Sequence, residues 1–266
     1  MPLAVCATPI GNLEDVTLRV LRVLAEADVV LCEDTRRTRI LLERHGISAR
    51  VLSYHEHNEA ERTAELLPRL RAGEHVALVS DAGLPAISDP GARLIGAALE
   101  AGVPVTVLPG ASAVETALVA SGFVGERYQF VGYLPRRDAA LVSLLEELRG
   151  WPWPAVAFES PRRLPATLRT LAERLPERPI AVCRELTKQF EEVVRGTPEE
   201  VAERFREPPK GEITLVLGPA EVVADERGGV AAVAELVAAG VPRRQASDLV
   251  ARLTGESRNT LYRRSL

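Results

Sequence analysis

Three loops rich in glycine and proline hold most of the residues that could bind a ligand. They follow the first, fourth and fifth strand-like runs, at residues 8–13 (Thr-Pro-Ile-Gly-Asn-Leu), 81–91 (Asp-Ala-Gly-Leu-Pro-Ala-Ile-Ser-Asp-Pro-Gly) and 109–113 (Pro-Gly-Ala-Ser-Ala). Glycine lets the backbone approach a ligand closely, and proline fixes the turn that positions it. One such loop could be an ordinary turn. Three at one end of a sheet predict a ligand site, because ligands bind where loops leave the carboxyl ends of parallel strands.

Two polar clusters follow the second and third strand-like runs and therefore fall on the same rim as these loops. They span residues 33–36 (Glu-Asp-Thr-Arg) and 55–59 (His-Glu-His-Asn-Glu). Carboxylate and imidazole groups are the side chains that most often move protons in enzymes. The two clusters therefore offer candidates for acid–base chemistry next to a bound ligand.

Several common site types are absent from the sequence. No G-x-G-x-x-G follows the first strand-like run and no G-x-x-x-x-G-K-[ST] occurs, so neither usual way of holding a pyrophosphate is supported. Cys6, Cys32 and Cys183 are far apart and lie in apolar runs, which predicts three buried thiols, no disulfide and no zinc site. The four histidines show no metal-ligand spacing, and we expect no metal.

The first part of the chain alternates strand-like apolar runs with helix-like stretches whose apolar residues recur at three-and-four spacing. Such alternation is typical of a parallel sheet with helices on both faces. We assign it to an N-terminal α/β domain, residues 1–111. The strand-like runs are residues 3–7, 29–32, 51–53, 76–80 and 105–108, and the helix-like stretches are residues 18–25, 38–44, 59–71 and 92–100.

A second α/β domain is expected over residues 112–220, after a helix near residues 112–121. Its strand-like runs are residues 128–132, 155–158, 180–183, 192–196 and 213–217. The short link between the third and fourth of these runs leaves no room for a helix, which predicts an antiparallel hairpin and hence a mixed sheet. Residues 225–229 (Asp-Glu-Arg-Gly-Gly) indicate a linker, and a helical tail follows at residues 228–266.

The tail has the pattern of a helix-turn-helix, with helices expected at residues 230–239, 244–253 and 259–264. One apolar face is predicted to contain Ala246, Leu249, Val250 and Leu253, and the last helix contributes Leu261.

Charge is distributed unevenly along the chain. The net charge is −4, but residues 241–266 carry six arginines against two acidic residues, a local charge of +4, which leaves −8 for the rest. A basic tail on an acidic body indicates a polyanionic partner at one end. A solvated helical face, or a packing or dimer role, remains an alternative.

The apolar runs and the N-terminal residues bear on cellular location and membrane association. None approaches the roughly 18 residues of a membrane span. The N-terminus runs directly into a strand-like segment, without the basic region of a signal peptide. We expect a cytoplasmic protein with no membrane partner.

Nine short motifs occur in an order that resembles one family. They are Thr8-Pro9-Ile10-Gly11-Asn12-Leu13, Glu33-Asp34-Thr35-Arg36, His55-Glu56-His57-Asn58-Glu59, Ser80-Asp81-Ala82-Gly83, Pro109-Gly110, Gly132-Tyr133-Leu134-Pro135, Glu159-Ser160, Arg184-Glu185-Leu186-Thr187-Lys188 and Lys210-Gly211-Glu212. Together they resemble the bacterial 16S rRNA (cytidine) 2′-O-methyltransferases, a group within the tetrapyrrole methylase superfamily. The resemblance spans roughly residues 3–218.

The resemblance implies the two-domain tetrapyrrole methylase fold, with S-adenosylmethionine folded in the cleft between the domains. It implies methyl transfer to a ribose 2′-hydroxyl of a decoding-centre cytidine in 16S rRNA, within the small ribosomal subunit, by a homodimer. The residues expected to contact the donor are Pro9, Asp81, Gly83 and Ser112 from the first domain, and Phe158 or Glu159, Arg184, Glu212 and Ile213 from the second.

A ribose hydroxyl is a poor nucleophile, so a nearby base or cation would assist the reaction that the resemblance implies. Asp34 and His55 are the candidate proton acceptors, and Arg36 is a candidate for placing the RNA backbone. Lys188, one of two lysines in the chain, is a further catalytic candidate because lysine offers a compact charge with a tunable pKa. The candidate RNA contacts are Arg136, Arg137, Arg243, Arg244, Arg258, Arg263 and Arg264.

Ordinary structural roles compete with these assignments. Asn58 could cap the helix that begins near residue 59, Arg36 could pair with Glu33, and Asp81 could form a turn. Two other functions stay open as well. One is methylation of a tetrapyrrole precursor or another small molecule on the same fold, and the other is ribosome-associated RNA binding without catalysis.

Overall fold

The computed structural model describes residues 1–220 and 226–265. The chain forms two compact units, Met1–Ala220 and Glu221–Leu266. The expected division of the first unit between residues 111 and 112 stays a prediction, although each of its two sheets lies on one side of that point.

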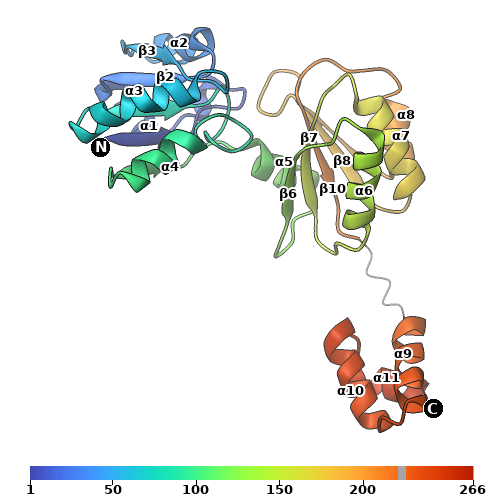
Figure 1. Ribbon diagram of the computed structural model, residues 1–266. Coiled ribbons are helices and arrows are strands. Elements are labelled where there is room, and N and C mark those ends of the chain that lie inside the picture. The colour runs from blue at the N-terminus through green and yellow to red at the C-terminus, as the bar shows by residue number, and fades with distance from the viewer. Residues whose placement is uncertain (221–225, 266) are drawn as a thin grey trace. The chain divides into compact units, whose positions relative to one another are not determined.

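The first sheet has five parallel strands in the order β3-β2-β4-β1-β5 (Figure 1). Successive strand residues point to opposite faces. Leu3 and Leu31 therefore pack with α3 and α4 on one face, whereas Ala4 and Cys32 pack with α1 and α2 on the other. This confirms the predicted parallel sheet with helices on both faces. The strands are β1 (Leu3–Cys6), β2 (Val29–Cys32), β3 (Val51–Ser53), β4 (Val76–Val79) and β5 (Val105–Leu108), and the helices are α1 (Leu18–Glu26), α2 (Thr35–Arg44), α3 (Glu59–Arg71) and α4 (Ala92–Glu100), with a short 3-10 helix at Leu13–Asp15.

The second sheet is mixed, as predicted. Its order is β6-β7-β10-β8-β9; β6 and β7 are parallel, and the other neighbours are antiparallel. The predicted hairpin is confirmed, since Val182 in β8 lies opposite Val194 in β9. The strands are β6 (Gln129–Tyr133), β7 (Ala155–Glu159), β8 (Ile180–Arg184), β9 (Glu192–Gly196) and β10 (Ile213–Leu217).

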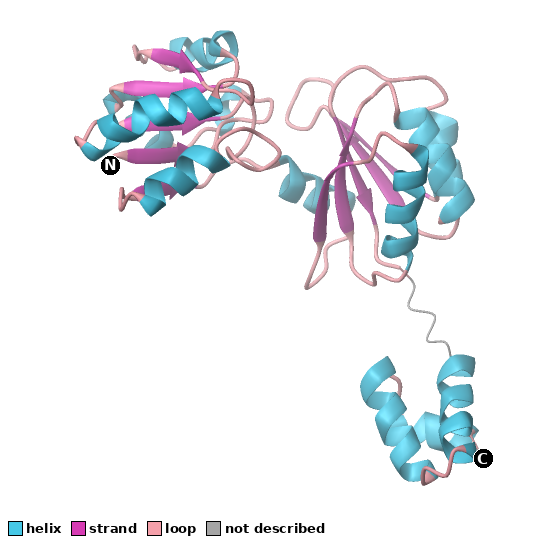
Figure 2. Ribbon diagram, viewed as in Figure 1, coloured by secondary structure: helices cyan, strands magenta, loops and turns pink. Residues whose placement is uncertain are grey.

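Helices cover both faces of this second sheet (Figure 2). Ala117 of α5 packs against Val156 and Val216 on one face. Helices α6, α7 and α8 cover the other face, where Leu145 and Leu168 are completely buried. The helices are α5 (Ala113–Ser121), α6 (Asp138–Arg149), α7 (Leu164–Arg174) and α8 (Pro198–Arg204); the sequence interpretation contained only the first of them.

The C-terminal unit has three helices among its described residues: α9 (Glu226–Ala238), α10 (Arg243–Thr254) and α11 (Arg258–Arg264). Its core contains Val233, Ala246, Val250 and Leu261. The predicted apolar face of α10 was wrong at two positions, because Leu249 is 40% exposed and Leu253 is 77% exposed.

The buried stripe of α10 runs through Ala246, Ser247 and Val250 instead. Ser247, which the predicted apolar face did not include, is therefore buried in α10.

The predicted linker at residues 225–229 was also wrong where the structure describes it. Residue 225 lies outside the described residues, but residues 226–229 belong to α9. A Cβ on Gly229 would lie 2.7 Å from the Glu256 carboxyl carbon, at the end of a side chain that can move aside. Among the described residues, no helix is long and apolar enough to cross a membrane.

Candidate functional site

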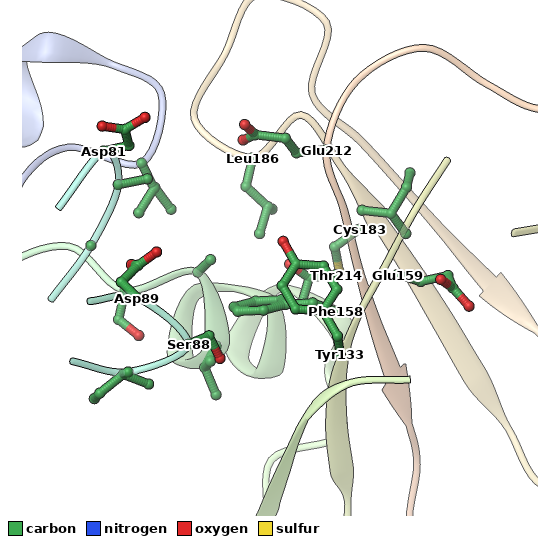
Figure 3. A pocket seen from close by; sticks show the side chains of 18 of the residues that line it. Asp81, Ser88, Asp89, Tyr133, Phe158, Glu159, Cys183, Leu186, Glu212 and Thr214 are labelled. Atoms are coloured by element: carbon green, nitrogen blue, oxygen red, sulfur yellow. The ribbon is translucent and has the colours of Figure 1, made fainter. Parts of the chain in front are cut away.

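The main pocket of the first unit has a volume of about 460 Å³. Loops that follow β1, β4 and β5 form one side, and residues of the second sheet form the other (Figure 3). The site therefore lies at the carboxyl ends of the first sheet's strands, as the glycine-rich loops predicted. The lining residues used below are Ile10, Arg37, Asp81, Gly83, Ser88, Asp89, Ser112, Tyr133, Phe158, Glu159, Cys183, Leu186, Glu212 and Ile213.

Backbone bonds join the loops that follow β1 and β4. The Thr8 N–H donates to the Gly83 carbonyl at 2.8 Å, and the Gly83 N–H donates back at 3.0 Å. The Thr8 hydroxyl also donates to the Ser80 carbonyl at 3.0 Å. Gly83 has a φ of 75°, a backbone conformation that residues with a side chain rarely adopt. The first-sheet side of the pocket is therefore fixed by its own backbone.

A close approach at Gly11 connects this side to the second sheet's loops. A Cβ on Gly11 would lie 2.7 Å from the Thr187 hydroxyl and 2.8 Å from the Leu186 carbonyl oxygen. The neighbouring Asn12 N–H donates to the Thr187 hydroxyl at 3.0 Å. Only glycine leaves room for this contact, which holds the loop of residues 8–13 against the loop after β8.

Lys188 lies beside this contact and is held by two carboxylates. Its Nζ lies 2.8 Å from Glu185 Oε1 and 3.0 Å from Glu212 Oε2. Burial lowers the lysine pKa, but the hydrogen bonds to Glu185 and Glu212 outweigh burial and raise the pKa above its ordinary value. Lys188 is therefore protonated and forms ion pairs with both carboxylates, and a protonated lysine cannot accept a proton.

A second pocket of about 230 Å³ adjoins the main one. Ile10, Arg37, Asp81 and Glu212 line both pockets. Arg37 Nη1 lies 3.6 Å from Asp81 Oδ2, so this ion pair stands at the boundary.

Most of the expected donor contacts come together in these pockets. The main pocket contains seven of the nine expected positions, and Pro9 lines the second pocket. Arg184 lines neither, because its guanidinium donates to Glu192 at 2.9 Å and to the Lys210 carbonyl at 3.1 Å. The seven are Asp81, Gly83, Ser112, Phe158, Glu159, Glu212 and Ile213.

Glu159 lines the pocket with its backbone rather than its carboxylate. Figure 3 shows its carboxylate turned away from the other labelled side chains. There it accepts from the Thr167 hydroxyl at 2.5 Å and pairs with Arg163 at 3.3 Å. This carboxylate supports β7 and α7, and Phe158 is the neighbour whose ring faces the cavity.

Asp34 lies next to the site but outside the lining of both pockets. Its N–H donates to Asp81 Oδ1 at 3.0 Å, while its own carboxylate caps α2 and binds the Arg36 guanidinium at 2.7 Å. The side-chain and backbone hydrogen bonds from Arg36 lower the pKa of Asp34 to about 2. The geometry makes Asp34 a support for Asp81 and a poor acceptor of protons, and Arg36 pairs with it instead of with Glu33.

His55 likewise lies outside both pocket linings. The ring Nε2 of His55 is 3.2 Å from the Asn58 amide nitrogen, and the backbone N–H of His55 donates to Asn58 Oδ1 at 2.9 Å. Asn58 occupies the N-cap position of α3, as the alternative expected, but its side chain makes no capping hydrogen bond. The catalytic roles of Asp34, Arg36, His55 and Lys188 stay predictions.

Sequence reasoning missed Arg37, Asp89 and Tyr133, all of which line the main pocket. Asp89 and Tyr133 lay within quoted motifs, so a signal existed for both. Burial and then the nearby charges of Glu33 and Asp81 raise the pKa of Asp89 to about 6. The Tyr133 and Phe158 rings meet edge to face with centroids 5.4 Å apart.

The three cysteines are free and buried, as predicted. Cys183 lines the main pocket, and its Sγ donates to the Ala117 carbonyl at 3.7 Å. Burial raises the pKa of its thiol to about 12. In the described part of the chain, no group of His, Cys, Asp and Glu residues could hold a metal ion.

The candidate RNA-binding arginines are at the surface or partly so. Arg136 and Arg137 are exposed in the loop before α6. In the C-terminal unit Arg243 is half-buried, and the other four are exposed; one of them, Arg258, lies 3.6 Å from Asp248. These others are Arg244, Arg258, Arg263 and Arg264.

Two family models match the chain. Residues 2–202 match Tetrapyrrole (Corrin/Porphyrin) Methylases, and residues 224–266 match the RsmI C-terminal HTH domain. The solved structure of uroporphyrin-III C-methyltransferase from Thermus thermophilus complexed with S-adenyl homocysteine shares the fold. It is 22% identical, has a TM-score of 0.58, and covers 81% of this chain and 96% of that one.

Curated relatives are closer in sequence. Ribosomal RNA small subunit methyltransferase I from Mesorhizobium japonicum is 46% identical over 263 residues, 98% of this chain and 90% of the relative. The protein of the same name from Thermotoga maritima is 45% identical over 223 residues, 82% of this chain and 99% of the relative. The chain therefore belongs to the tetrapyrrole methylase family, in the group whose members are named ribosomal RNA small subunit methyltransferase I.

Proposed function

We propose that the protein transfers a methyl group from S-adenosylmethionine to the ribose 2′-hydroxyl of a decoding-centre cytidine in 16S rRNA. The main pocket carries the proposal, because loops from both sheets enclose it in a chain whose relatives bear an rRNA methyltransferase name. Small-molecule sites are usually clefts of about 300–1,000 Å³, and the volume of about 460 Å³ falls within this range.

The pocket's chemistry suits a sulfonium donor. A sulfonium is cationic, and aromatic faces and carboxylates attract cations. Tyr133 and Phe158 lie across the pocket from Asp81 (Figure 3). The absence of a pyrophosphate-binding loop in the sequence agrees with a donor that has no phosphate.

The bound donor would supply an already activated methyl group, so the protein has mainly to position the reactants and exclude water. Gly83 and the residues around it present backbone to the cavity. The Gly11 contact holds the opposing loop close, and Arg37 stands where a second reactant would enter from the adjoining pocket.

The arginines of α2 support an RNA substrate. Arg36, Arg37, Arg39 and Arg44 of α2 are exposed, and Arg37 lines both pockets. Arginines bind phosphates strongly, and such contacts make nucleic-acid affinity depend on salt. These residues lie in the acidic part of the chain, so the positive charge of α2 is a local feature.

The C-terminal unit would add RNA contacts without supplying the catalytic pocket. The match to the Thermotoga maritima relative covers 99% of that protein but 82% of this chain, so about 48 residues of this chain have no counterpart in it. That number is close to the length of the C-terminal unit, residues 221–266. We therefore expect the unit to increase affinity for the assembled small subunit. Action as a homodimer and a cytoplasmic location belong to the same proposal.

The test has two steps. Calorimetry measures S-adenosylmethionine binding to the wild type, to Phe158→Ala, and to Phe190→Ala, whose ring is 66% exposed and outside both pockets. We expect Phe158→Ala alone to weaken binding. Labelled donor is then offered to small ribosomal subunits that lack the modification and, separately, to tetrapyrrole precursors. Label on a ribose of 16S rRNA supports the proposal, and label on the tetrapyrrole alone overturns it.

A further inference from the structure

Four acidic residues line the main pocket, and three of them are engaged. Asp81 accepts from the Asp34 N–H and pairs with Arg37, as described above. Glu212 binds Lys188, and the Glu159 carboxylate points away from the cavity to Thr167. Within residues 1–220 and 226–265, the structure gives the Asp89 carboxylate no hydrogen bond and no ion pair.

The loop that presents Asp89 has an uncommon backbone. Ala86 has a φ of 70° and Ser88 a φ of 62°, values that non-glycine residues rarely adopt. Gly91, with a φ of 141°, lets the loop pass close to the core, because a Cβ there would lie 3.0 Å from Leu78 Cδ2. Backbone strain of this kind tends to be retained where it positions a functional group.

We propose that Asp89 is the catalytic base that accepts the proton of the substrate hydroxyl. The inference rests on the proposed function, because it assigns a residue to the methyl transfer in that pocket. It replaces the sequence candidates Asp34 and His55, which lie outside the lining of both pockets; the Asp34 carboxylate also binds the Arg36 guanidinium.

The step balances without a further reactant. The hydroxyl oxygen forms a bond to the methyl carbon while the carbon–sulfur bond breaks, and its electron pair stays on sulfur as a neutral thioether. The hydroxyl proton passes to a carboxylate oxygen of Asp89. The protonated Asp89 returns its proton to water after the product leaves.

The charges around Asp89 suit this role at neutral pH. Burial raises its pKa to about 6, and the like charges of Glu33 and Asp81 act in the same direction. Tyr133 faces the same group, and its own pKa is raised by burial and by Asp89. Arg37, which pairs with Asp81, is the cation on this side of the pocket. A base is most effective when its pKa lies close to the working pH, so that it is ionised yet still basic.

The pH dependence follows with a definite sign. The unprotonated form is the active one, so kcat/KM of the wild type rises about tenfold per pH unit below pH 6 and levels off above it. Loss of a general base usually costs about 10²–10⁴-fold in rate.

The experiment compares full-length wild type, Asp89→Asn, Asp89→Glu and the control Asp138→Asn, which changes an exposed carboxylate in the first turn of α6. Calorimetry measures donor binding, and single-turnover transfer to small ribosomal subunits is followed between pH 5 and 8. We expect Asp89→Asn to bind the donor normally, to react at least about 100-fold more slowly, and to lose the rise near pH 6. Asp89→Glu recovers part of the rate, and Asp138→Asn behaves as wild type.

Two outcomes overturn the assignment while the proposed function stands. One is an Asp89→Asn rate within about threefold of an active wild type. The other is a weakening of donor binding as large as the loss of rate, which would make Asp89 a donor-binding group. A wild type that binds the donor but transfers nothing to RNA overturns the proposed function, and this inference with it.

Discussion

Substituting Gly11 by alanine should separate the two sides of the pocket. The new Cβ would lie 2.5 Å from Lys188 Cγ, 2.7 Å from the Thr187 hydroxyl and 2.8 Å from the Leu186 carbonyl oxygen. The lysine methylene can move at little cost, but a backbone carbonyl cannot. The loops must therefore shift apart, and the Asn12–Thr187 hydrogen bond of 3.0 Å lengthens or breaks.

The size of the effect follows from these contacts. Forcing an extra methyl group into a packed site costs about 1–3 kcal/mol, and a lost hydrogen bond adds about 1 kcal/mol. For a unit of this size, each kcal/mol lowers Tm by about 2–4 °C, so we expect a decrease of about 5–10 °C. The donor should bind roughly tenfold more weakly, which corresponds to about 1.4 kcal/mol.

Gly96→Ala is the matched control. Gly96 lies within α4, and a Cβ there meets nothing within 4 Å. Because glycine destabilises a helix by about 0.5–1 kcal/mol relative to alanine, this variant should melt at a slightly higher temperature and bind the donor normally. Thermal melting and calorimetry measure both quantities. A Gly11→Ala protein that melts and binds like the wild type would show that the loops do not depend on this close approach.

Three further outcomes are expected. Arg178 is 5% exposed and donates to the carbonyls of Gly218 at 2.9 Å and Trp153 at 3.0 Å. Arg178→Met should therefore lower the free energy of unfolding, measured by denaturant titration, by about 3 kcal/mol. The control Arg169→Met, which changes an exposed arginine, should leave the free energy of unfolding unchanged. Asp34→Asn should transfer methyl groups within about threefold of wild type. In the folded protein the pKa of Asp34 is lowered from 3.8 to about 2, so its ionised carboxylate stabilises the fold above pH 4. The Tm difference between Asp34→Asn and wild type should therefore disappear as the pH falls from 4 to 2. A large loss of the methyl-transfer rate in Asp34→Asn at neutral pH would restore Asp34 as the candidate base. Native protein at pH 8 should resist alkylation of all three cysteines, as intact mass will show, and rapid labelling without denaturant would refute the burial argument.

The sequence predicted the sheets well because buried parallel strands are continuous apolar runs, such as residues 29–32 and 76–79. Helices α6, α7 and α8 were not predicted from the sequence. One of them had a clear start signal, since Thr197 and Glu200 form a capping box at α8. The paired glycines at 228–229 indicated a linker because glycine disfavours a helix interior, but both residues belong to α9 in the structure.

The sequence predicted the location of the pocket better than it predicted which side chains line it. Glycine-rich loops at the carboxyl ends of parallel strands fix the location by topology alone. Which carboxylate faces the cavity depends on the turn geometry and on the hydrogen-bond partners that compete for it. The spacing of residues along the sequence reveals neither of these. Arg36 and Arg37 show the difference: they are adjacent in α2, but the first binds Asp34 outside the pocket linings and the second lines both pockets.

The buried thiol of Cys183 has a consequence for any reaction carried out beside it. A sulfonium donor is an alkylating agent, and an ionised thiol is a far stronger nucleophile than a sugar hydroxyl. Burial that holds the thiol pKa at about 12 keeps this sulfur protonated at neutral pH, and its hydrogen points to the Ala117 carbonyl. The enzyme can thus hold a reactive methyl group near its own cysteine without modifying itself, and the apolar packing under α5 protects the catalyst from suicide inactivation as well as stabilising the fold.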